Sequence, residues 1–518
     1  MSQLNKDCLF MIFNELENDR LTLYSCLFIN REWCENVVPV LWKHPWQFFI
    51  QRDYLYYQSI TINEWYLFKT ILLHLWEESH ENLNRQKIKL FNKSTKKPLF
   101  NYVGYCKYLD FSNLNILIDE TFQTYDETKC SIIKVEILKM FIRKTRIINF
   151  TMPRLENFRL QLFPGIDNWL SDIECLTCDS NINQETFIEL ARLCKSIKSL
   201  NIFLGNLNNP GLFRFIKVQK QLHEIGFSLD PTNNDIDFCS FHQTFRDALT
   251  ANANTIQHFK LTHGVLFPFS VLSSLVNLKS LYVGNRITYD FWSDLEICSF
   301  PNLVKLVTYK IPLEKTARMI ENSTSKLIEI IIEYTIYHQA YYDRCIQAIC
   351  QTCPRLKYFK IIVKMTDDFY KLRDILQNCH YLEGLVIEFP YSIRGWNYNI
   401  IKVDEVDNTD SDIDEESEYS LIEDEDDCKI LCEILAKYSP MCLYKFKLQN
   451  MKTLTTDNLK IFFDNWKDRP PMLLQTMPGC RLFGKHFDLI REYTEKGVIK
   501  KYDNILNMED NYDYFEWK

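Results

Sequence analysis

The chain has 518 residues, of which 46% are hydrophobic and 14% aromatic, so it can build extensive buried cores and is not a disordered protein. The formal net charge is −8 at pH 7, but 14 acidic residues lie in the single run 404–427, and the rest of the chain is mildly basic without a long Lys/Arg cluster. Glycine is scarce and no phosphate-binding glycine motif occurs, so we expect no nucleotide site. Without a basic cluster we expect no nucleic-acid binding, and because no apolar run reaches about 18 residues we expect no membrane span.

The N-terminus does not have the pattern of a secretory signal, because its apolar stretch, Leu9–Phe13, is short and acidic residues follow directly. We therefore expect a protein of the cytoplasm, the nucleus or both, in which the 18 cysteines remain thiols. A buried cysteine behaves as a small hydrophobic side chain, so most of them should lie in cores.

Residues 4–46 predict three short helices. In the first helix, the apolar side chains follow the i, i+3, i+4, i+7 spacing of one helical stripe: Leu9, Ile12, Phe13 and Leu16. A second apolar cluster lies at 23–28, and a third helix begins near Asn30 and is interrupted at Pro39. So small a unit buries few residues and would gain stability by docking onto a partner.

The same stretch resembles the F-box. That family has an Ile-Phe pair, a Leu three residues later, an Asp-Leu feature, an Asn-Arg-x-Trp segment and a closing Leu-Trp. Here these are Ile12-Phe13, Leu16, Asp19 with Leu21, Asn30-Arg31-Glu32-Trp33 and Leu41-Trp42. The chain departs from the family at Asn5, where the family prefers Pro.

The resemblance implies that residues 1–46 are an F-box that docks onto a Skp-type adaptor and, through it, joins a cullin–RING ubiquitin ligase. The adaptor-binding residues that it implies are Leu4, Leu9, Ile12, Phe13, Leu16, Trp33, Leu41 and Trp42. An alternative is that these apolar side chains only form the core of a helical cap on a repeat array. The sequence does not separate the core of the module from an adaptor-facing surface.

Residues 47–104 are predicted to be a connecting region, rich in aromatic side chains. Within it, Glu64–Trp76 is predicted to be a buried helix, and the polar stretch Asn82–Pro98 an exposed loop. A flexible tether would be rich in Gly and Ser, so the aromatic composition indicates a rigid join.

The strongest pattern is a six-residue string, apolar-x-x-apolar-x-apolar, in which the last two apolar residues alternate inward on a short strand. The strings begin at Leu155, Ile173, Ile197, Leu222, Ile256, Leu278, Leu303, Leu327, Leu356, Leu382 and Leu443. Most are spaced at or near the 20–29 residues of leucine-rich repeats. Helical patterns lie between them, at 185–194, 341–350, 369–376 and 428–437.

Cys194, Cys353 and Cys379 each stand three residues before the start of a string, which resembles the cysteine-containing leucine-rich repeats often joined to F-boxes. We therefore predict an α/β repeat fold, in which a three-helix F-box precedes a leucine-rich-repeat solenoid with a curved parallel sheet and outer helices. The solenoid should occupy 105–400, and terminal repeats with a C-terminal cap should occupy 428–518.

Charged side chains between the apolar positions of the strings should project from the concave face of the sheet, the usual binding face. They include Lys305, Lys357, Lys360 and Glu383. The acidic segment 401–427 is predicted to be a disordered insertion between repeats. It is either a passive solvated loop or one that is phosphorylated or binds a basic partner.

No chemical site is predicted. Cys175-x-x-Cys178 and Cys350-x-x-Cys353 have a spacing found in zinc sites, but no second Cys or His pair completes either, so buried thiols are favoured. No H-E-x-x-H motif and no framed cysteine nucleophile occurs. We expect no catalytic residue, no metal and no cofactor.

These features predict a non-enzymatic substrate-recognition subunit of an SCF-type cullin–RING ubiquitin ligase. In this hypothesis the F-box docks the Skp-type adaptor and the repeats bind a client protein whose identity the sequence does not give. The alternative function is a leucine-rich-repeat interaction scaffold that acts outside any ubiquitin ligase.

Overall fold

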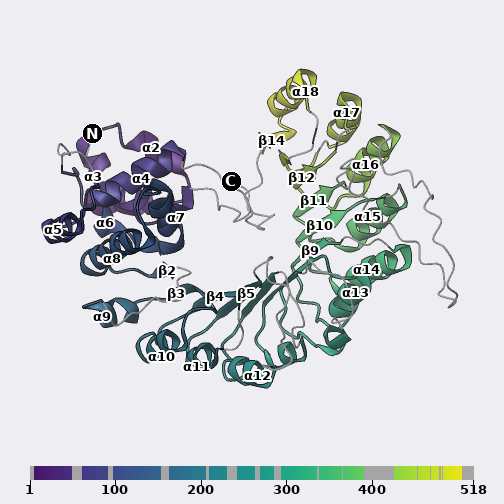
Figure 1. The fold of residues 1–518 in the computed structure, drawn as a ribbon. Coiled ribbons are helices and arrows are strands. Elements are labelled where there is room, and N and C mark those ends of the chain that lie inside the picture. The colour runs from purple at the N-terminus through teal and green to yellow at the C-terminus, as the bar shows by residue number, and fades with distance from the viewer. Residues whose placement is uncertain are drawn as a thin grey trace, which may run out of the picture. The chain divides into compact units, whose positions relative to one another are not determined.

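A computed structural model of the chain describes most of residues 5–504 (Figure 1). The residues outside the description are 1–4, 49–60, 91–96, 153–162, 206–208, 230–241, 263–268, 285–292, 335–337, 365, 390–424, 452, 467, 478–479, 481 and 505–518. The chain divides into two compact units, Met1–Thr255 and Ile256–Lys518.

The first unit begins with three short helices, which we call the head: α1 (Lys6–Glu15), α2 (Arg20–Cys26) and α3 (Arg31–Leu41). Side chains cap two of them. The Asp19 carboxylate accepts the backbone N–H of Thr22 at 3.1 Å, and the Asn30 side chain accepts that of Trp33 at 2.9 Å. These bonds satisfy backbone donors that a helix start leaves unpaired, so they fix where α2 and α3 begin.

The connecting region is mostly helical. Its elements are η1 (Pro45–Phe48), α4 (Ile62–Leu72), α5 (Glu77–Arg85), α6 (Tyr102–Tyr105), α7 (Phe111–Thr121) and α8 (Glu127–Lys144). The predicted exposed loop over 82–98 is wrong at its start, because Asn82–Arg85 completes α5. Leu83 and Ile88 are buried there, and two apolar anchors are enough to hold a polar segment on the core.

Five strands of the first unit pair in parallel in chain order: β1 (Tyr108–Asp110), β2 (Asn149–Thr151), β3 (Cys175–Asp179), β4 (Ser199–Leu204) and β5 (Glu224–Leu229). The helices that follow are α9 (Ile166–Ser171), α10 (Gln184–Leu193), α11 (Pro210–Lys217) and α12 (His242–Thr250). Parallel strands with intervening helices confirm an α/β repeat in this unit.

The second unit repeats the arrangement. Its strands are β6 (His258–Thr262), β7 (Ser280–Gly284), β8 (Lys305–Tyr309), β9 (Glu329–Glu333), β10 (Tyr358–Ile362), β11 (Gly384–Glu388), β12 (Lys445–Gln449), β13 (Met472–Thr476) and β14 (Ile499–Asn504). The helical elements are η4 (Phe269–Ser274), η5 (Ser293–Ile297), α13 (Leu313–Glu321), α14 (Gln339–Thr352), α15 (Thr366–Asn378), α16 (Glu425–Tyr438), α17 (Thr456–Asp464) and α18 (Gly484–Glu495). In Figure 1, α13–α18 lie on one side of this sheet, and we call the opposite side the open face.

The strand register confirms the predicted strings. The middle apolar residues of successive strings are direct neighbours in one row of the strands of the second unit, and all are buried against the helices: Phe259, Leu281, Leu306, Ile330, Phe359, Leu385 and Phe446. Each thin strand–helix layer therefore shares its core with its neighbours. The string at Leu155 lies outside the described residues, and strands β1, β2, β13 and β14 were not predicted.

A buried position at the ends of several helices ties one repeat to the next. Cys194, Cys353 and Cys379 are fully buried there. Gln219 occupies the corresponding place after α11 and donates its amide to the carbonyl of Cys194 at 3.1 Å. Asn252, after α12, donates to the carbonyl of Ile216 at 2.9 Å. Thiols and amides both occur at this position, since either can donate to a backbone carbonyl.

The head continues the hydrogen-bond pattern of the sheet. The carbonyl of Lys107, just before β1, accepts the N–H groups of Ile148 and Asn149 at 2.8 and 3.1 Å. In the same way, the carbonyl of Lys43, just after α3, accepts the N–H groups of Lys107 and Tyr108 at 2.9 and 3.2 Å. The Trp46 indole also donates to the carbonyl of Tyr108 at 2.8 Å. The head therefore takes the place of a repeat that would precede β1.

The predicted domain boundaries stay predictions. Residues 401–424 of the acidic insertion lie outside the description, while Glu425–Asp427 form the first turn of α16.

Candidate protein-interaction surfaces

The head has its own apolar core. Its buried residues come from all three helices: Leu9, Phe13, Leu23, Cys26, Val37 and Val40. The Phe13 and Trp33 rings meet edge to face, with centroids 5.3 Å apart. Such contacts stabilise a small module beyond the area they bury.

The structure distributes the predicted adaptor-binding residues over different environments. Leu9 and Phe13 are buried, and only Ile12, at 45% exposure, presents a large part of its side chain to solvent. The others are half-buried: Leu16, Trp33 and Leu41 pack against the core, and Trp42 lies 4.8 Å from the Tyr102 ring of α6. Leu4 lies outside the described residues. Their role in adaptor binding stays a prediction.

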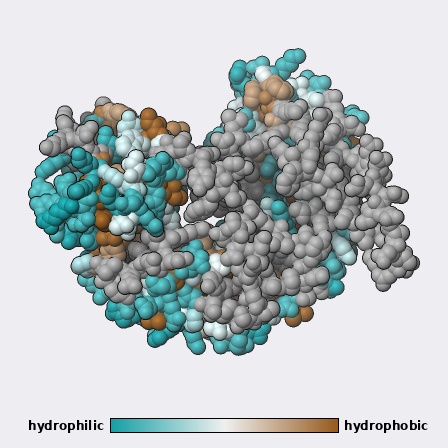
Figure 2. All heavy atoms as spheres, in the orientation of Figure 1, coloured by the Kyte–Doolittle hydropathy of each residue, from teal (hydrophilic) through white to brown (hydrophobic). Residues whose placement is uncertain are grey.

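A larger exposed apolar surface lies on α1, α2 and the turn after α2. We call it the head patch, and its members are 45–83% exposed: Phe10, Met11, Ile12, Leu21, Tyr24, Phe28 and Ile29. Figure 2 shows hydrophobic surface over the part of the first unit that holds these helices. The prediction from sequence named only Ile12. A usable signal was present, since Phe10 and Met11 are apolar but lie off the buried stripe of α1.

The open face of the second unit carries cross-strand ion pairs. Lys305 of β8 lies 2.8 Å from Glu329 of β9, and Lys357 lies 2.7 Å from Glu383. The hydrogen bond from Lys357 to Glu383 raises the pKa of the lysine. Three of the four predicted face charges, Lys305, Lys357 and Glu383, thus pair with neighbouring repeats, which orders this surface without a ligand.

The fourth predicted face charge, Lys360 of β10, is buried instead of projecting into solvent. Its ammonium lies 2.5 Å from Glu333 of β9 and 2.8 Å from Glu388 of β11. Burial raises the pKa of Glu388, and the lysine opposes that rise. The two carboxylates arrive from strands on either side, so a single buried cation bridges three repeats.

An apolar floor runs beside these charges. It consists of Tyr282, Val307, Ile331, Val386 and Met477, with Tyr309 and Tyr358 packed against it. The ammonium of Lys260 lies 5.3 Å from the Tyr282 ring centre, and that of Lys445 lies 5.2 Å from the Tyr358 ring centre. Tyrosine and lysine side chains above an aliphatic floor suit an aromatic and acidic partner.

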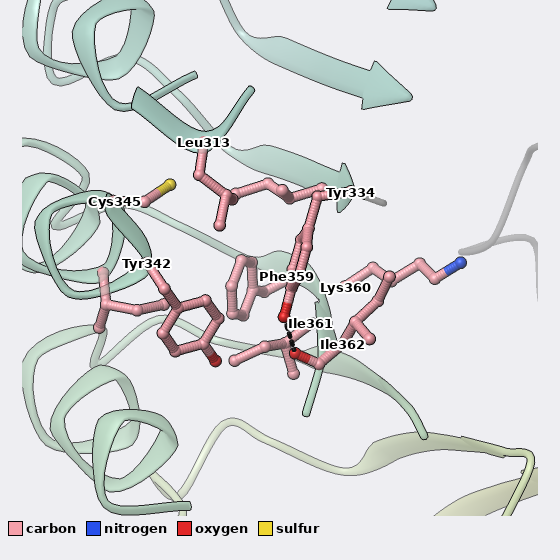
Figure 3. A pocket seen from close by; sticks show the side chains of 10 residues that line it. Leu313, Tyr334, Tyr342, Cys345, Phe359, Lys360, Ile361 and Ile362 are labelled. Atoms are coloured by element: carbon pink, nitrogen blue, oxygen red, sulfur yellow. Dashed lines mark hydrogen bonds between the residues drawn. The ribbon is translucent and has the colours of Figure 1, made fainter. Parts of the chain in front are cut away.

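A small cavity lies on the helix side of the same sheet (Figure 3). It has a volume of about 10 Å³ and is lined by side chains of β9, β10, α13 and α14, among them Leu313, Tyr342 and Phe359. This space admits at most about one water molecule, so it is not a substrate site. Figure 3 shows the hydrogen bond from the Tyr334 hydroxyl to the carbonyl of Ile362, 3.0 Å long, and Lys360 extending away from the cavity.

The candidate zinc cysteines lie in the repeat cores. Cys178 and Cys353 are buried, and Cys175 and Cys350 are half-buried. Burial raises the pKa of Cys350 and of Cys353 to about 11, which disfavours the thiolate that binds metals. Among the described residues, no three His, Cys, Asp or Glu side chains gather into a possible metal site. None of the helices described is both long and apolar enough to span a membrane.

No protein-family model matches the chain, and no curated protein does. Among solved structures, one described as the complex of Rad7 and Elc1 in yeast is similar with a TM-score of 0.40 and 11% identity, over 87% of this chain and 93% of that chain. An internalin, InlF from Listeria monocytogenes, gives 0.28 and 10% over 77% and 91%. A TLR13–ssRNA13 complex gives 0.25 and 12% over 71% and 62%. These TM-scores are too low to assign a fold family. The α/β repeat of this chain is instead established by the order and register of its strands.

Proposed function

We propose that this chain is the substrate-recognition subunit of an SCF-type cullin–RING ubiquitin ligase. In this proposal the head is an F-box that binds a Skp-type adaptor, and the repeats bind a client protein. The observation that carries it is the head patch, seven large apolar side chains exposed on a module that already has a separate core. Such a concentration of exposed apolar side chains on a small module is characteristic of a protein interface.

The proposal assigns no chemistry to the chain. A receptor accelerates transfer of ubiquitin by holding the client near the enzyme that carries it, which raises the effective concentration of client lysines. The contacts of Trp46 and Lys43 with Tyr108 support this role, because they fix the head on the first strand. A client bound to the repeats of the first unit would then be held at a defined position relative to the adaptor.

The decisive experiment changes the head patch without touching the head core. Leu21 and Leu99 are both leucines with 83% exposure in the first unit, and only Leu21 belongs to the patch. Leu21→Glu should abolish co-purification with a recombinant Skp-type adaptor, because a carboxylate would be buried unpaired in the interface. Leu99→Glu should leave co-purification unchanged.

Phe13→Ala is unsuitable for this test, because Phe13 is a core residue and its truncation costs about 3–5 kcal/mol, enough to unfold the head. Adaptor binding that survives in a folded Leu21→Glu variant would contradict the proposed interface. If the unmodified chain fails to bind the adaptor at all, the alternative of a repeat scaffold outside a ubiquitin ligase would replace the proposal.

A further inference from the structure

Lysine side chains recur on one edge of the first unit, where repeat helices end and the next strands begin. The strings that begin at Ile197 and Leu222 are 25 residues apart, and the same interval separates Lys195 from Lys220. Both lysines are exposed, and each directly follows the buried residue that ends its repeat helix. Two neighbouring repeats therefore present equivalent lysines at the same edge.

A hydrogen bond holds these two lysines next to each other. Gln219, directly before Lys220, donates its side-chain amide to the carbonyl of Cys194, directly before Lys195, at 3.1 Å. Both anchoring residues are buried, so the turns that carry the lysines are fixed to one another. Because like charges repel at short range, this arrangement costs free energy unless an anion offsets it.

Two further cations extend the cluster along α11. Arg214 and Lys217 are exposed, and their spacing of three residues puts them on one face of the helix. Figure 1 shows α11 beside α10, the helix that precedes Lys195. We call the four residues the basic edge: Lys195, Arg214, Lys217 and Lys220.

Within the described part of the chain, no carboxylate forms an ion pair with the basic edge. Lys195 donates to a backbone carbonyl, that of Ala191. The neighbouring Lys198 differs, because its ammonium lies 2.9 Å from the carboxylate of Glu174. The cations of the basic edge are therefore available to the anions of a partner.

The helix dipole explains only part of this charge. Basic side chains in the last turn of a helix stabilise it by about 0.3–1 kcal/mol each, and this accounts for Arg214 and Lys217 of α11. The effect falls off outside the last turn, and Lys220 lies beyond the C-cap residue Val218. The edge is thus more basic than the stability of its helices requires.

The surroundings of the basic edge restrict the class of anionic partner. Among the described residues of 149–255, none of the large apolar or aromatic side chains is exposed. Single-stranded nucleic acid is held by stacking on aromatic rings, and helices that bind membranes insert an apolar face. Proteins that bind duplex DNA commonly contact about six to ten phosphates, more than four cations neutralise. An acidic polypeptide needs neither aromatic nor apolar contacts.

We propose that the basic edge binds an acidic segment of a partner protein, whose carboxylates form ion pairs with the exposed lysines and arginine. The cations stand at fixed positions on two adjacent repeats, so they select carboxylates that are spaced to match. The proposal concerns the first unit alone and holds whether or not the head binds an adaptor.

The first test measures the anisotropy of a fluorescein-labelled peptide of about 12 residues, alternating Glu and Ser, with the full chain. The peptide should bind in about 0.05 M salt and bind at least about 10-fold more weakly in about 0.3 M salt, because salt screens exposed charges. A peptide with Gln in place of Glu should not bind. Failure of the Glu peptide to bind at low salt would overturn the proposal.

Two double variants test where the peptide binds. Lys217→Glu with Lys220→Glu should weaken binding at least about 10-fold, because it reverses two charges of the basic edge. Lys437→Glu with Lys485→Glu makes the same change on exposed lysines of α16 and α18 in the second unit and should leave binding unchanged. Equal affinities of the two variants for the peptide would contradict the proposal.

A milder variant keeps the test valid if charge reversal disturbs folding. Lys217→Gln with Lys220→Gln removes charge from exposed positions and should leave the circular dichroism unchanged while weakening peptide binding at least about 3-fold. Unaltered binding by this folded variant would overturn the proposal. An oligothymidylate and vesicles that contain phosphatidylserine are the competing ligands. If either binds more tightly than the peptide, and the Gln variant loses that binding, the edge is not a site for acidic protein.

Discussion

The ammonium of Lys360 lies 2.8 Å from the Oε2 atom of Glu388, one strand away on the open face of the second unit. With Glu333 on the other side, this lysine forms ion pairs with two carboxylates that are largely removed from water. Removing the lysine charge leaves the two carboxylates buried without a counter-charge. The free-energy cost of that is larger than the net stabilisation that the intact cluster provides.

Lys360→Met should therefore lower the free energy of unfolding by about 3–5 kcal/mol, measured by urea denaturation. Lys357→Met is the matched change, because Lys357 makes a single ion pair with Glu383 and its side chain is 43% exposed. It should cost much less than Lys360→Met, because solvent screens an exposed ion pair. Equal losses from the two variants would show that the buried position of Lys360 is not what matters.

Glu136 of α8 should make stability depend on pH. Burial would raise its pKa, but hydrogen bonds from Ser79, Lys139 and Asn82 outweigh burial and hold the pKa below its usual value of 4.5. Because folding lowers this pKa, the carboxylate stabilises the protein above pH 4.5, and this contribution is lost as the pH falls through the folded pKa.

Glu136→Gln should consequently be less stable than the unmodified chain at pH 7, and the difference should shrink below about pH 4.5. Urea titrations at pH 7, 5 and 4 would measure it. Glu81→Gln removes an exposed carboxylate of α5 that pairs with Arg85, and its effect at pH 7 should be small. A Glu136→Gln difference that grows on acidification would refute the assignment.

The cap of α3 should control the stability of the head. Asn30→Ala removes the acceptor for the Trp33 N–H and should cost about 1 kcal/mol, whereas Asn30→Asp keeps an acceptor and should cost little. Hydrogen exchange of the α1–α3 amides would report the loss locally. Equal exchange in the two variants would mean that the side-chain cap does not matter.

Thr308 stands in a column of apolar side chains, and its hydroxyl is buried without a hydrogen-bond partner. Thr308→Val keeps the shape and removes the unpaired hydroxyl, so it should raise the free energy of unfolding by about 1 kcal/mol. Thr352→Val is the comparison, because that hydroxyl donates to the carbonyl of Ala348 at 2.7 Å and its loss should not stabilise the protein. Thermal denaturation measures both.

Much of the repeat could be predicted because inward-facing residues of a strand recur at period two and neighbouring repeats place them in register. The rule found β9, β10 and β12 from Leu327, Leu356 and Leu443. It missed β13, because the first position of that string is Pro471 and the last is Thr476, whose hydroxyl lies 2.7 Å from that of Tyr502. An apolar pattern cannot reveal a polar residue that is satisfied by a partner 26 residues away.

The interaction surfaces were less predictable. Helical periodicity correctly put Leu9 and Phe13 on one stripe, but that stripe became the core of the head, and the exposed surface formed from Leu21 and Phe28 on other elements. Lys360 was predicted to project into solvent. Its burial depends on two carboxylates 27 and 28 residues away, and one sequence does not show which repeats supply them.

The hydrogen bonds to the Lys43 carbonyl determine how the chain responds to truncation at its N-terminus. By accepting the N–H groups that precede and begin β1, it closes an edge that would otherwise invite another strand to add. Excising residues 1–46 to abolish adaptor binding would therefore also expose the edge of the parallel sheet at β1 and favour aggregation. An adaptor-binding module and a terminal cap are therefore compatible interpretations of the N-terminal residues, because the capping contacts come from Lys43 and Trp46 and the exposed apolar side chains from residues 10–29.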